Sequence, residues 1–310
     1  MDNISKLIAE KTGYANLMDD LDKKLSGSEL NSLLLELFRK RVKQISPAEL
    51  LRQFDKNRFS VPSTVETISF KQLEIRCLQL ASEKNFSVVT LSPLTTLGTC
   101  SVFGYVDQNN VVSALRGTEV VSDATNVFAL MIAKEFKKGK NNEVTRYATA
   151  HRHVRSQALY NPSFTPHFAV FCMATGGLDK GNFSFELEHL LEHMQIHLSL
   201  LSNEFEKDKL SIKIFLKDDN EVFHQKLQDA MKRFDRLKIE KESSPGNYYR
   251  LVQFKFFLEQ EGQEINLSDG GFVDWTQKLI PNKKHRLIIS GIGTELLHKI
   301  KHPHGIDKTG

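Results

Sequence analysis

The chain has 310 residues, of which 40% are hydrophobic and 26% are charged, and its formal net charge is +4. This composition is ordinary for a soluble globular protein and excludes a disordered or fibrous chain. No apolar run approaches the roughly 20 residues that span a bilayer, and the N-terminus lacks the apolar stretch of a signal peptide. The cysteines, Cys77, Cys100 and Cys172, are odd in number and far apart, so we expect a reduced, cytoplasmic protein without disulfides.

Residues 1–62 are expected to form a helical appendage. Ser26-Gly27-Ser28-Glu29 has the spacing of a capping box, and a run with helical character follows it. Ser46-Pro47-Ala48-Glu49 combines a serine N-cap, proline at the first helical position and a glutamate three residues after the cap. We therefore divide the chain into an N-terminal helical segment, 1–62, and a core domain, 63–310.

The pattern of the core domain predicts an α+β fold with a largely antiparallel sheet. Apolar residues from Phe70 to Ala81 share one face of a helix, and a β-rich run over 86–91 follows it. Asp123 and Thr125 are candidate caps for a helix over 127–133. Further strands are predicted at 144–150, 167–174, 210–216, 237–240, 248–258, 264–267 and 287–290, and further helices at 185–201, 221–234, 273–279 and from 294.

Five short segments follow one another in a fixed order between residues 70 and 300. They are a helix and strand that end at Pro93, Leu115-Arg116-Gly117-Thr118-Glu119, His151-Arg152-His153-Val154-Arg155, Tyr248-Tyr249 with the later Gly270-Gly271, and Ser290-Gly291-Ile292-Gly293-Thr294-Glu295. In order and spacing they resemble the catalytic core of the class II aminoacyl-tRNA synthetases, in particular the histidyl branch. The resemblance implies a class II synthetase-like antiparallel sheet flanked by helices, to which the helical segment is added.

The resemblance also implies a role for each matching residue. Arg152 falls on the arginine that holds the α-phosphate of ATP, and it is the expected catalytic residue because charge develops on that phosphate. We expect Arg116 and Arg155 to hold phosphate or carboxylate, and Glu119 to accept an ammonium group. The rest of the predicted ligand-binding set is Thr118, Gln157, Tyr248, Tyr249, Gly270, Gly271, Gly291 and Gly293.

Four positions depart from the family pattern. Val154 replaces the glutamate that reads adenine, and Pro245, Phe272 and Leu296 stand where the family has arginines. Arginines held against phosphate contribute strongly to nucleotidyl transfer, so we expect no ordinary histidine activation. The combination resembles the regulatory subunit of ATP phosphoribosyltransferase, a histidyl-like core that binds ligand without charging tRNA.

Two functional classes remain open. The lost arginines favour a non-catalytic sensor or partner subunit that binds an amino-acid-like or nucleotide ligand. The alternative is an adenylate-forming ligase with a rearranged site for ATP and Mg²⁺. For both we expect a homodimer, because the helix and strand before Pro93 form the dimer interface in the family. We expect a small-molecule ligand and, for the sensor, a protein partner. Neither tRNA nor a membrane is an expected partner, since the sequence ends soon after the third motif and leaves no anticodon-binding domain.

A third class, a zinc peptidase, is indicated by His189-Leu190-Leu191-Glu192-His193. This segment matches the His-x-x-Glu-His pattern, in which the two histidines share a helix face, and His197 extends that row. A solvated histidine face is the competing interpretation. No third ligand can be placed from the sequence, so we assign no metal ligands. His298, His302 and His304 are predicted to lie in a flexible tail.

Overall fold

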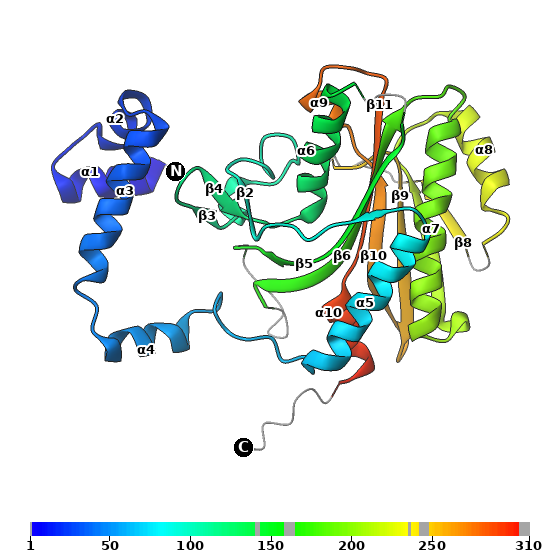
Figure 1. The fold of residues 1–310 in the computed structure, drawn as a ribbon, viewed down its shortest axis with the longest axis horizontal. Coiled ribbons are helices and arrows are strands. Elements are labelled where there is room, and N and C mark those ends of the chain that lie inside the picture. Colours follow the sequence, from blue (N-terminus) through cyan, green and yellow to red (C-terminus); the bar gives the residue numbers. More distant parts are fainter. Residues whose placement is uncertain (1, 140–142, 158–164, 235–236, 242–247, 304–310) are drawn as a thin grey trace.

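An eight-stranded sheet forms the centre of the computed structural model, which describes residues 2–139, 143–157, 165–234, 237–241 and 248–303 (Figure 1). The strand order is β1-β5-β6-β11-β10-β9-β7-β8, and neighbours are antiparallel except for the parallel pairs β1–β5 and β7–β8. The strands are β1 (Ser87–Val88), β5 (Thr145–Val154), β6 (His167–Leu178), β7 (Leu210–Leu216), β8 (Leu237–Lys241), β9 (Arg250–Gln260), β10 (Gln263–Phe272) and β11 (His285–Ile292).

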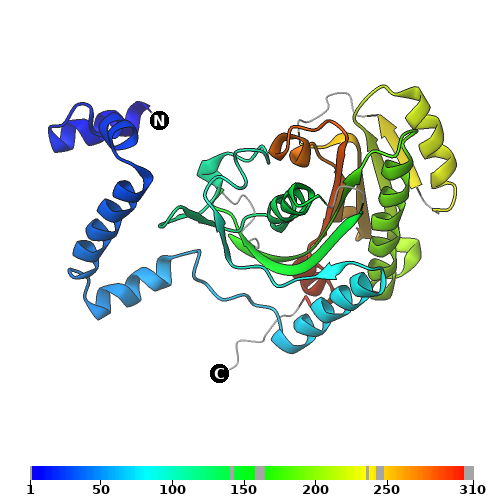
Figure 2. The same cartoon turned by 45° about the horizontal axis from the view of Figure 1, so that its top comes forward.

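Helices cover both faces of this sheet (Figures 1 and 2). One face carries α6 (Ala124–Lys137) and α9 (Trp275–Leu279). The other carries α5 (Thr67–Glu83), α7 (Ser184–Glu204), α8 (Glu221–Met231) and α10 (Thr294–Lys301). A second sheet, ordered β2-β4-β3, consists of β2 (Leu94–Thr96), β3 (Ser113–Ala114) and β4 (Thr118–Val120). Short 3₁₀ turns occur at Gln108–Asn110 and Lys207–Lys209.

Side chains of β6 supply both hydrophobic cores. Phe171 and Met173 belong to the core on the α7 side, whereas Cys172 and Ala174 belong to the core under α6. This alternation follows from the period of two along a strand. Gly176 permits the close approach of α6, because a Cβ at this position would lie 2.5 Å from Cγ2 of Ile132. The strand is therefore specified on both faces by apolar packing.

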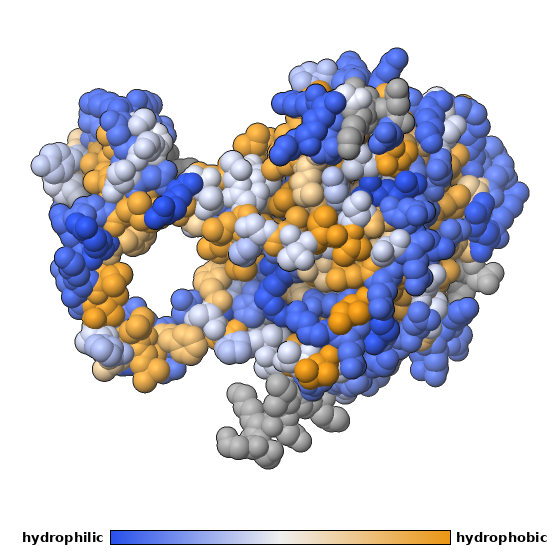
Figure 3. Space-filling view, viewed as in Figure 1, coloured by the Kyte–Doolittle hydropathy of each residue, from blue (hydrophilic) through white to orange (hydrophobic). Residues whose placement is uncertain are grey.

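Four helices precede the core and form an N-terminal arm, residues 2–56, which extends away from it (Figures 1 and 2). They are α1 (Asp2–Thr12), α2 (Leu17–Lys24), α3 (Gly27–Val42) and α4 (Pro47–Lys56). The capping box at Ser26 is present, and the hydroxyl of Ser46 accepts a hydrogen bond from the amide of Glu49 at the start of α4. Neither α2, α3 nor α4 has a buried residue, and an open gap separates part of the arm from the core (Figure 3). The predicted boundary at 62 falls in the connection between α4 and α5.

The predicted α+β class and the largely antiparallel sheet are confirmed, but three local predictions are wrong. The strand expected over 86–91 is only Ser87–Val88, because the chain leaves the sheet edge for the small sheet. Gly270 and Gly271, expected after a strand, lie inside β10, where a Cβ on Gly271 would lie 2.4 Å from the carbonyl oxygen of Val252. His298, expected in a tail, is buried on α10 with its Nε2 2.7 Å from the Ser69 hydroxyl, while His304 lies outside the described residues.

None of the helices that the structure describes is both long and apolar enough to cross a membrane.

Candidate ligand-binding site

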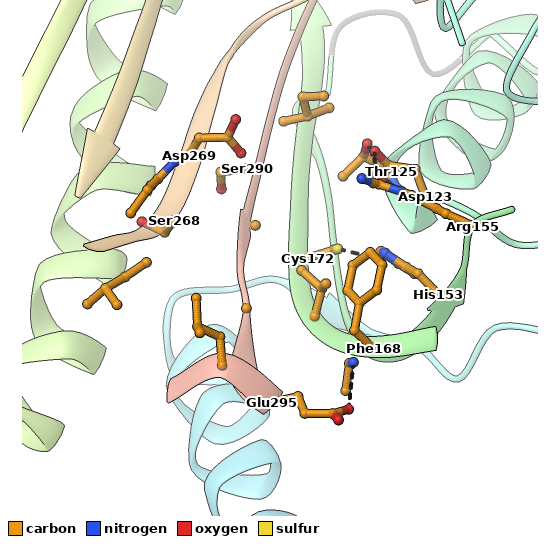
Figure 4. A pocket seen from close by; sticks show the side chains of 18 of the residues that line it. Asp123, Thr125, His153, Arg155, Phe168, Cys172, Ser268, Asp269, Ser290 and Glu295 are labelled. Atoms are coloured by element: carbon orange, nitrogen blue, oxygen red, sulfur yellow. Dashed lines mark hydrogen bonds and ion pairs between the residues drawn. The ribbon is translucent and has the colours of Figure 1, made fainter. Parts of the chain in front are cut away.

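A cavity of about 1020 Å³ lies between the large sheet and the N-terminal ends of α6 and α10 (Figure 4). The strands β6, β10 and β11 contribute lining residues from the centre of the sheet, including Cys172, Asp269 and Gly291. The remaining walls come from the end of β5, from α6 and α10, and from the segments around Val106, Lys217 and Tyr248. This position at the centre of the sheet brings polar groups from distant parts of the sequence together.

Asp123 is the N-cap of α6 and faces this cavity. Its Oδ1 accepts hydrogen bonds from the amide and the hydroxyl of Thr125, at 2.9 Å and 2.7 Å. The hydroxyl of Tyr248 donates to Oδ2 at 3.2 Å, and Nη2 of Arg155 lies 3.8 Å from the same oxygen. These partners and the positive end of the helix hold the carboxyl group of Asp123 in a fixed orientation.

A second carboxylate, Asp269 on β10, lies across the cavity from Asp123 (Figure 4). Burial raises the pKa of Asp269, and the negative charge of Asp123 raises it further, although Lys255 acts in the opposite direction. Tyr249 hydrogen-bonds to Asp269, and burial raises the pKa of this phenol well above its ordinary value. A cationic ligand group between the two carboxylates would relieve their mutual repulsion.

His153 and Cys172 lie behind Asp123 and are buried. Nε2 of His153 accepts a hydrogen bond from the amide of Ala124 at 3.0 Å and lies 3.9 Å from Sγ of Cys172. Burial lowers the pKa of His153 to about 3, against the opposing effect of Asp123, so the imidazole is neutral. Burial also raises the pKa of Cys172 well above its ordinary value, so the sulfur is a thiol at neutral pH.

Solved structures with this architecture establish the fold. A histidyl-tRNA synthetase from S. aureus superposes with a TM-score of 0.59 at 14% identity, covering 80% of this chain and 72% of that one. An ATP phosphoribosyltransferase regulatory subunit/histidyl-tRNA synthetase from Bacillus halodurans gives 0.62 at 12% identity, covering 78% and 81%. The chain has a class II aminoacyl-tRNA synthetase-like fold. A putative threonyl-tRNA synthetase from Aeropyrum pernix also matches, with a TM-score of 0.57 at 13% identity over 75% of this chain and 60% of that one.

No protein-family model matches the sequence, and no curated protein matches it. At these low identities the structural similarity defines the class II synthetase-like fold alone. The roles of individual residues in this chain must therefore be judged from their own contacts.

Six of the predicted site residues line the cavity of this synthetase-like core, and six do not. Those at the cavity are Arg155, Gln157, Tyr248, Tyr249, Gly291 and Gly293. Those elsewhere are Arg116, Thr118, Glu119, Arg152, Gly270 and Gly271. Arg155 is the only arginine among the described residues that line the cavity, and its guanidinium lies 5.1 Å from the ring centre of Phe168.

Arg152, the predicted catalytic residue, is not among the lining residues, although its partner Glu295 is. On β5 it is opposite Ala169, and the neighbouring His153 points to the other face of the strand and lines the cavity. Nη1 of Arg152 lies 2.8 Å from Oε2 of Glu295 and 2.8 Å from Nδ1 of His167. Because successive strand residues face opposite ways, a displacement of the motif match by one residue would exchange the face that it selects.

The segment around Glu119 belongs to the small sheet and not to the cavity. The fully buried carboxylate of Glu119 accepts hydrogen bonds from the amides of Gly98 and Cys100, at 2.8 Å and 3.1 Å, and from Gln108 at 3.0 Å. The amide of Arg116 donates to Asn31 in the arm at 2.7 Å. Asp123 and Thr125, close by in the sequence, do line the cavity. Their order, acidic residue, small residue, threonine, is that of the family's Glu-Gly-Thr.

The departures from the family pattern have different surroundings. Leu296 lines the cavity, so the arginine of the family is replaced there by an apolar group. Phe272 is buried in the core on the α7 side, and the amide of Val154 donates to the carbonyl of Val121 at 3.1 Å. Pro245 lies outside the described residues.

The histidines of α7 are buried, so the predicted solvated face is wrong. His193 contacts the hydroxyls of Ser290 and Thr175 at 2.8 Å and 2.9 Å, and His197 contacts those of Ser268 and Ser290 at 2.9 Å and 3.0 Å. Nδ1 of His189 lies 3.0 Å from Glu192. Both ring nitrogens of His193 and of His197 are thus engaged inside the fold, which weighs against the peptidase alternative.

Proposed function

We propose that this protein binds an amino-acid-like ligand in the cavity, does not charge tRNA, and acts as a sensor or partner subunit. The observation that carries the proposal is the pairing of two facing carboxylates, Asp123 and Asp269, with a single arginine, Arg155. The carboxylates suit an ammonium group, and the guanidinium suits a carboxylate. A zwitterionic amino-acid-like molecule presents both charges.

The surroundings of Arg152 support the absence of charging. Its partner Glu295 is almost completely buried and also accepts hydrogen bonds from Ser63 at 2.8 Å and from the amide of Ala169 at 3.3 Å. Burial acts to raise the pKa of Glu295, but the hydrogen bonds from Ser63 and Lys299 and the charge of Arg152 outweigh it and lower that pKa. Moving Arg152 to a phosphate would leave a buried carboxylate with less compensation, which is unfavourable. Arg152 therefore acts as a structural residue in this proposal.

We further propose that the protein is a cytoplasmic homodimer with a protein partner. Apolar residues of α5 and β1, Ile68, Ile75 and Val88, are 66%, 51% and 40% exposed and offer a surface for a second copy. The Bacillus halodurans structure is described as a regulatory subunit, which is in keeping with a partner protein. Cys77, Cys100 and Cys172 are free and buried, as suits a reducing compartment.

An adenylate-forming ligase is the second candidate, and it would require ATP and Mg²⁺. The observation in its favour is that Lys217 and Lys299 line the cavity together with Arg155. The amine of Lys299 lies 3.0 Å from Glu295, so part of this positive charge is neutralised within the protein. A folded protein that binds no nucleotide in a calorimetric titration would exclude this candidate.

Calorimetric titration with a panel of amino acids tests the proposal. We expect binding of at least one amino acid, weakened about tenfold or more by Asp123→Asn, because a hydrogen bond to a charged group contributes about 1.5–3 kcal/mol. Arg116→Ala is the matched control and should leave the affinity unchanged. A folded protein that binds no member of the panel, or an Asp123→Asn variant that binds as tightly as the parent, would contradict the proposal.

A further inference from the structure

Three side chains beside the cavity offer different metal-binding atoms within a small volume. They are Asp123 at the start of α6, His153 on β5 and Cys172 on β6, and their donor atoms all lie within 4.8 Å of one another. Figure 4 shows the three residues on one wall of the cavity. We infer that Asp123, His153 and Cys172 bind one divalent transition-metal ion, preferably zinc, whose fourth coordination position opens into the cavity.

The separation of the histidine and cysteine donor atoms is close to that around a tetrahedral ion. Zinc–sulfur and zinc–nitrogen bonds of about 2.3 Å and 2.0–2.1 Å at the tetrahedral angle separate the two ligand atoms by about 3.5 Å. Nε2 of His153 lies 3.9 Å from Sγ of Cys172 in the structure. A movement of a few tenths of an ångström would therefore bring both atoms to their bonding positions.

The chemistry of the donors selects the class of ion. One carboxylate, one imidazole and one thiolate form a mixed set that zinc accepts, whereas Mg²⁺ and Ca²⁺ prefer oxygen ligands alone. Three protein ligands leave one tetrahedral position for an exogenous group, as in zinc sites that handle small molecules. The cavity supplies the space for that group.

The protein already orients two of the three ligands. Thr125 and Tyr248 hold the Asp123 carboxylate through hydrogen bonds, and such outer contacts fix metal ligands in their sites. Nδ1 of His153 is buried and has no hydrogen-bond partner among the described residues, so the ring makes fewer contacts than those of His193 and His197. Nε2 has one donor, the amide of Ala124, which the metal would replace.

Metal binding changes the protonation of one residue. Zinc binds cysteine as the thiolate and histidine as the neutral imidazole. A bound ion would therefore displace the proton of the Cys172 thiol. Binding at neutral pH should thus release one proton, that of Cys172, to solvent.

The metal site is independent of the identity of the ligand. Coordination of a ligand amine by the open position would require the ammonium group to release one proton to solvent, and it rests on the proposed amino-acid-binding function. The occupancy of the site by metal does not. Metal binding is therefore tested with the ion alone, and amino-acid binding is measured separately. A protein that takes up no metal ion but binds an amino acid would contradict the metal site and leave the proposed function standing.

Titration of the reduced, chelator-treated full chain with Co²⁺ is the direct experiment. We expect one Co²⁺ per chain, the visible bands of a tetrahedral ion and a near-ultraviolet thiolate-to-cobalt band, all reversed by Zn²⁺. Cys172→Ala should abolish the thiolate band, and Asp123→Asn should weaken binding at least tenfold while keeping a helix cap. Cys77→Ala, which removes a buried cysteine from the other face of the sheet, is the matched control and should bind as the parent does.

Three results would overturn the assignment. They are a folded parent protein that binds no Co²⁺, a thiolate band that survives Cys172→Ala, and binding that is lost in His189→Ala but kept in His153→Gln. The proton count adds a check that does not depend on variants. Calorimetry of Zn²⁺ binding in two buffers of different ionisation enthalpy should give one proton released per ion, and a count of zero would contradict a Cys172 ligand.

Discussion

His153 on the cavity face differs from His193 and His197 on the α7 face in how many hydrogen bonds its buried ring makes. On the α7 face, His193 and His197 use both ring nitrogens to contact hydroxyls of the sheet. On the cavity face, Nδ1 of His153 has no partner among the described residues. A saturated buried network mainly holds a fold together, whereas a ring with a single backbone hydrogen bond can exchange that bond for a ligand. Hydrogen-bond satisfaction thus separates histidines that spacing in the sequence cannot separate.

The largest expected effect is the loss of His193. His193→Ala should lower the free energy of unfolding by about 3–5 kcal/mol, because it creates a cavity and leaves two buried hydroxyls with fewer partners. His153→Ala should cost about 1–3 kcal/mol, since it removes one hydrogen bond beside an existing cavity. Urea unfolding of the two variants measures the difference, and an equal or reversed order would break the comparison.

The next prediction distinguishes Arg152, which lies on β5, from Arg155, which follows directly after it. Arg155→Ala should reduce amino-acid affinity about tenfold or more, through the lost charged contact, and change stability little. Arg152→Ala should leave the affinity for the amino acid unchanged. It should cost about 1–3 kcal/mol of stability, because the buried carboxylate of Glu295 loses one of its partners. Calorimetry and urea unfolding on the same samples test both. A loss of amino-acid affinity in Arg152→Ala would contradict this prediction and indicate that Arg152 takes part in ligand binding.

A third effect concerns pH. Because burial and Asp123 raise the pKa of Asp269, its folded state holds a proton more tightly than its unfolded state does. The stabilising contribution of protonated Asp269 is present at low pH and is lost as pH rises through the raised pKa of Asp269. Asp269→Asn should therefore gain stability over the parent as pH rises above the ordinary value of 3.8, and urea midpoints across this range measure the gain. A gain in the stability of Asp269→Asn that grows as pH falls would contradict this prediction.

The same titration should act on ligand affinity. An ammonium group requires the ionised form of Asp269, so affinity for an amino acid should fall as pH is lowered through the raised pKa. Asp269→Asn should bind more weakly at neutral pH and lose that part of the pH dependence.

The smallest expected effect lies in the N-terminal arm. Phe54 of α4 is 50% exposed, and Phe54→Ser should change the free energy of unfolding by less than about 0.5 kcal/mol. Urea unfolding tests this value. A large loss of stability would indicate that α4 packs against the core in solution.

The fold was predictable because its signals are local or ordered along the chain. The caps at Ser26 and Ser46 depend on neighbouring residues. The strands predicted at 144–150 and 167–174 form the hairpin of β5 and β6. The face of β5 was not predictable, because a displacement of one residue exchanges Arg152 for His153. Asp123-Ala124-Thr125 did carry a usable signal, the acidic–small–threonine order, which the match at Glu119 obscured.

The metal-binding cluster could not be predicted from spacing. His153 and Cys172 are 19 residues apart on adjacent strands, and their proximity depends on the register of the hairpin. Asp123 joins them only because α6 starts over that hairpin. Each contact therefore requires the tertiary arrangement.

ATP–pyrophosphate exchange with a panel of amino acids tests most directly whether this synthetase-like core activates its ligand. Our account predicts binding of an amino acid by calorimetry but no amino-acid-dependent exchange, because Arg155 is the only arginine among the described residues of the cavity. Exchange that depends on the amino acid and is abolished by Arg155→Ala or Arg152→Ala would contradict it and identify the protein as a ligase.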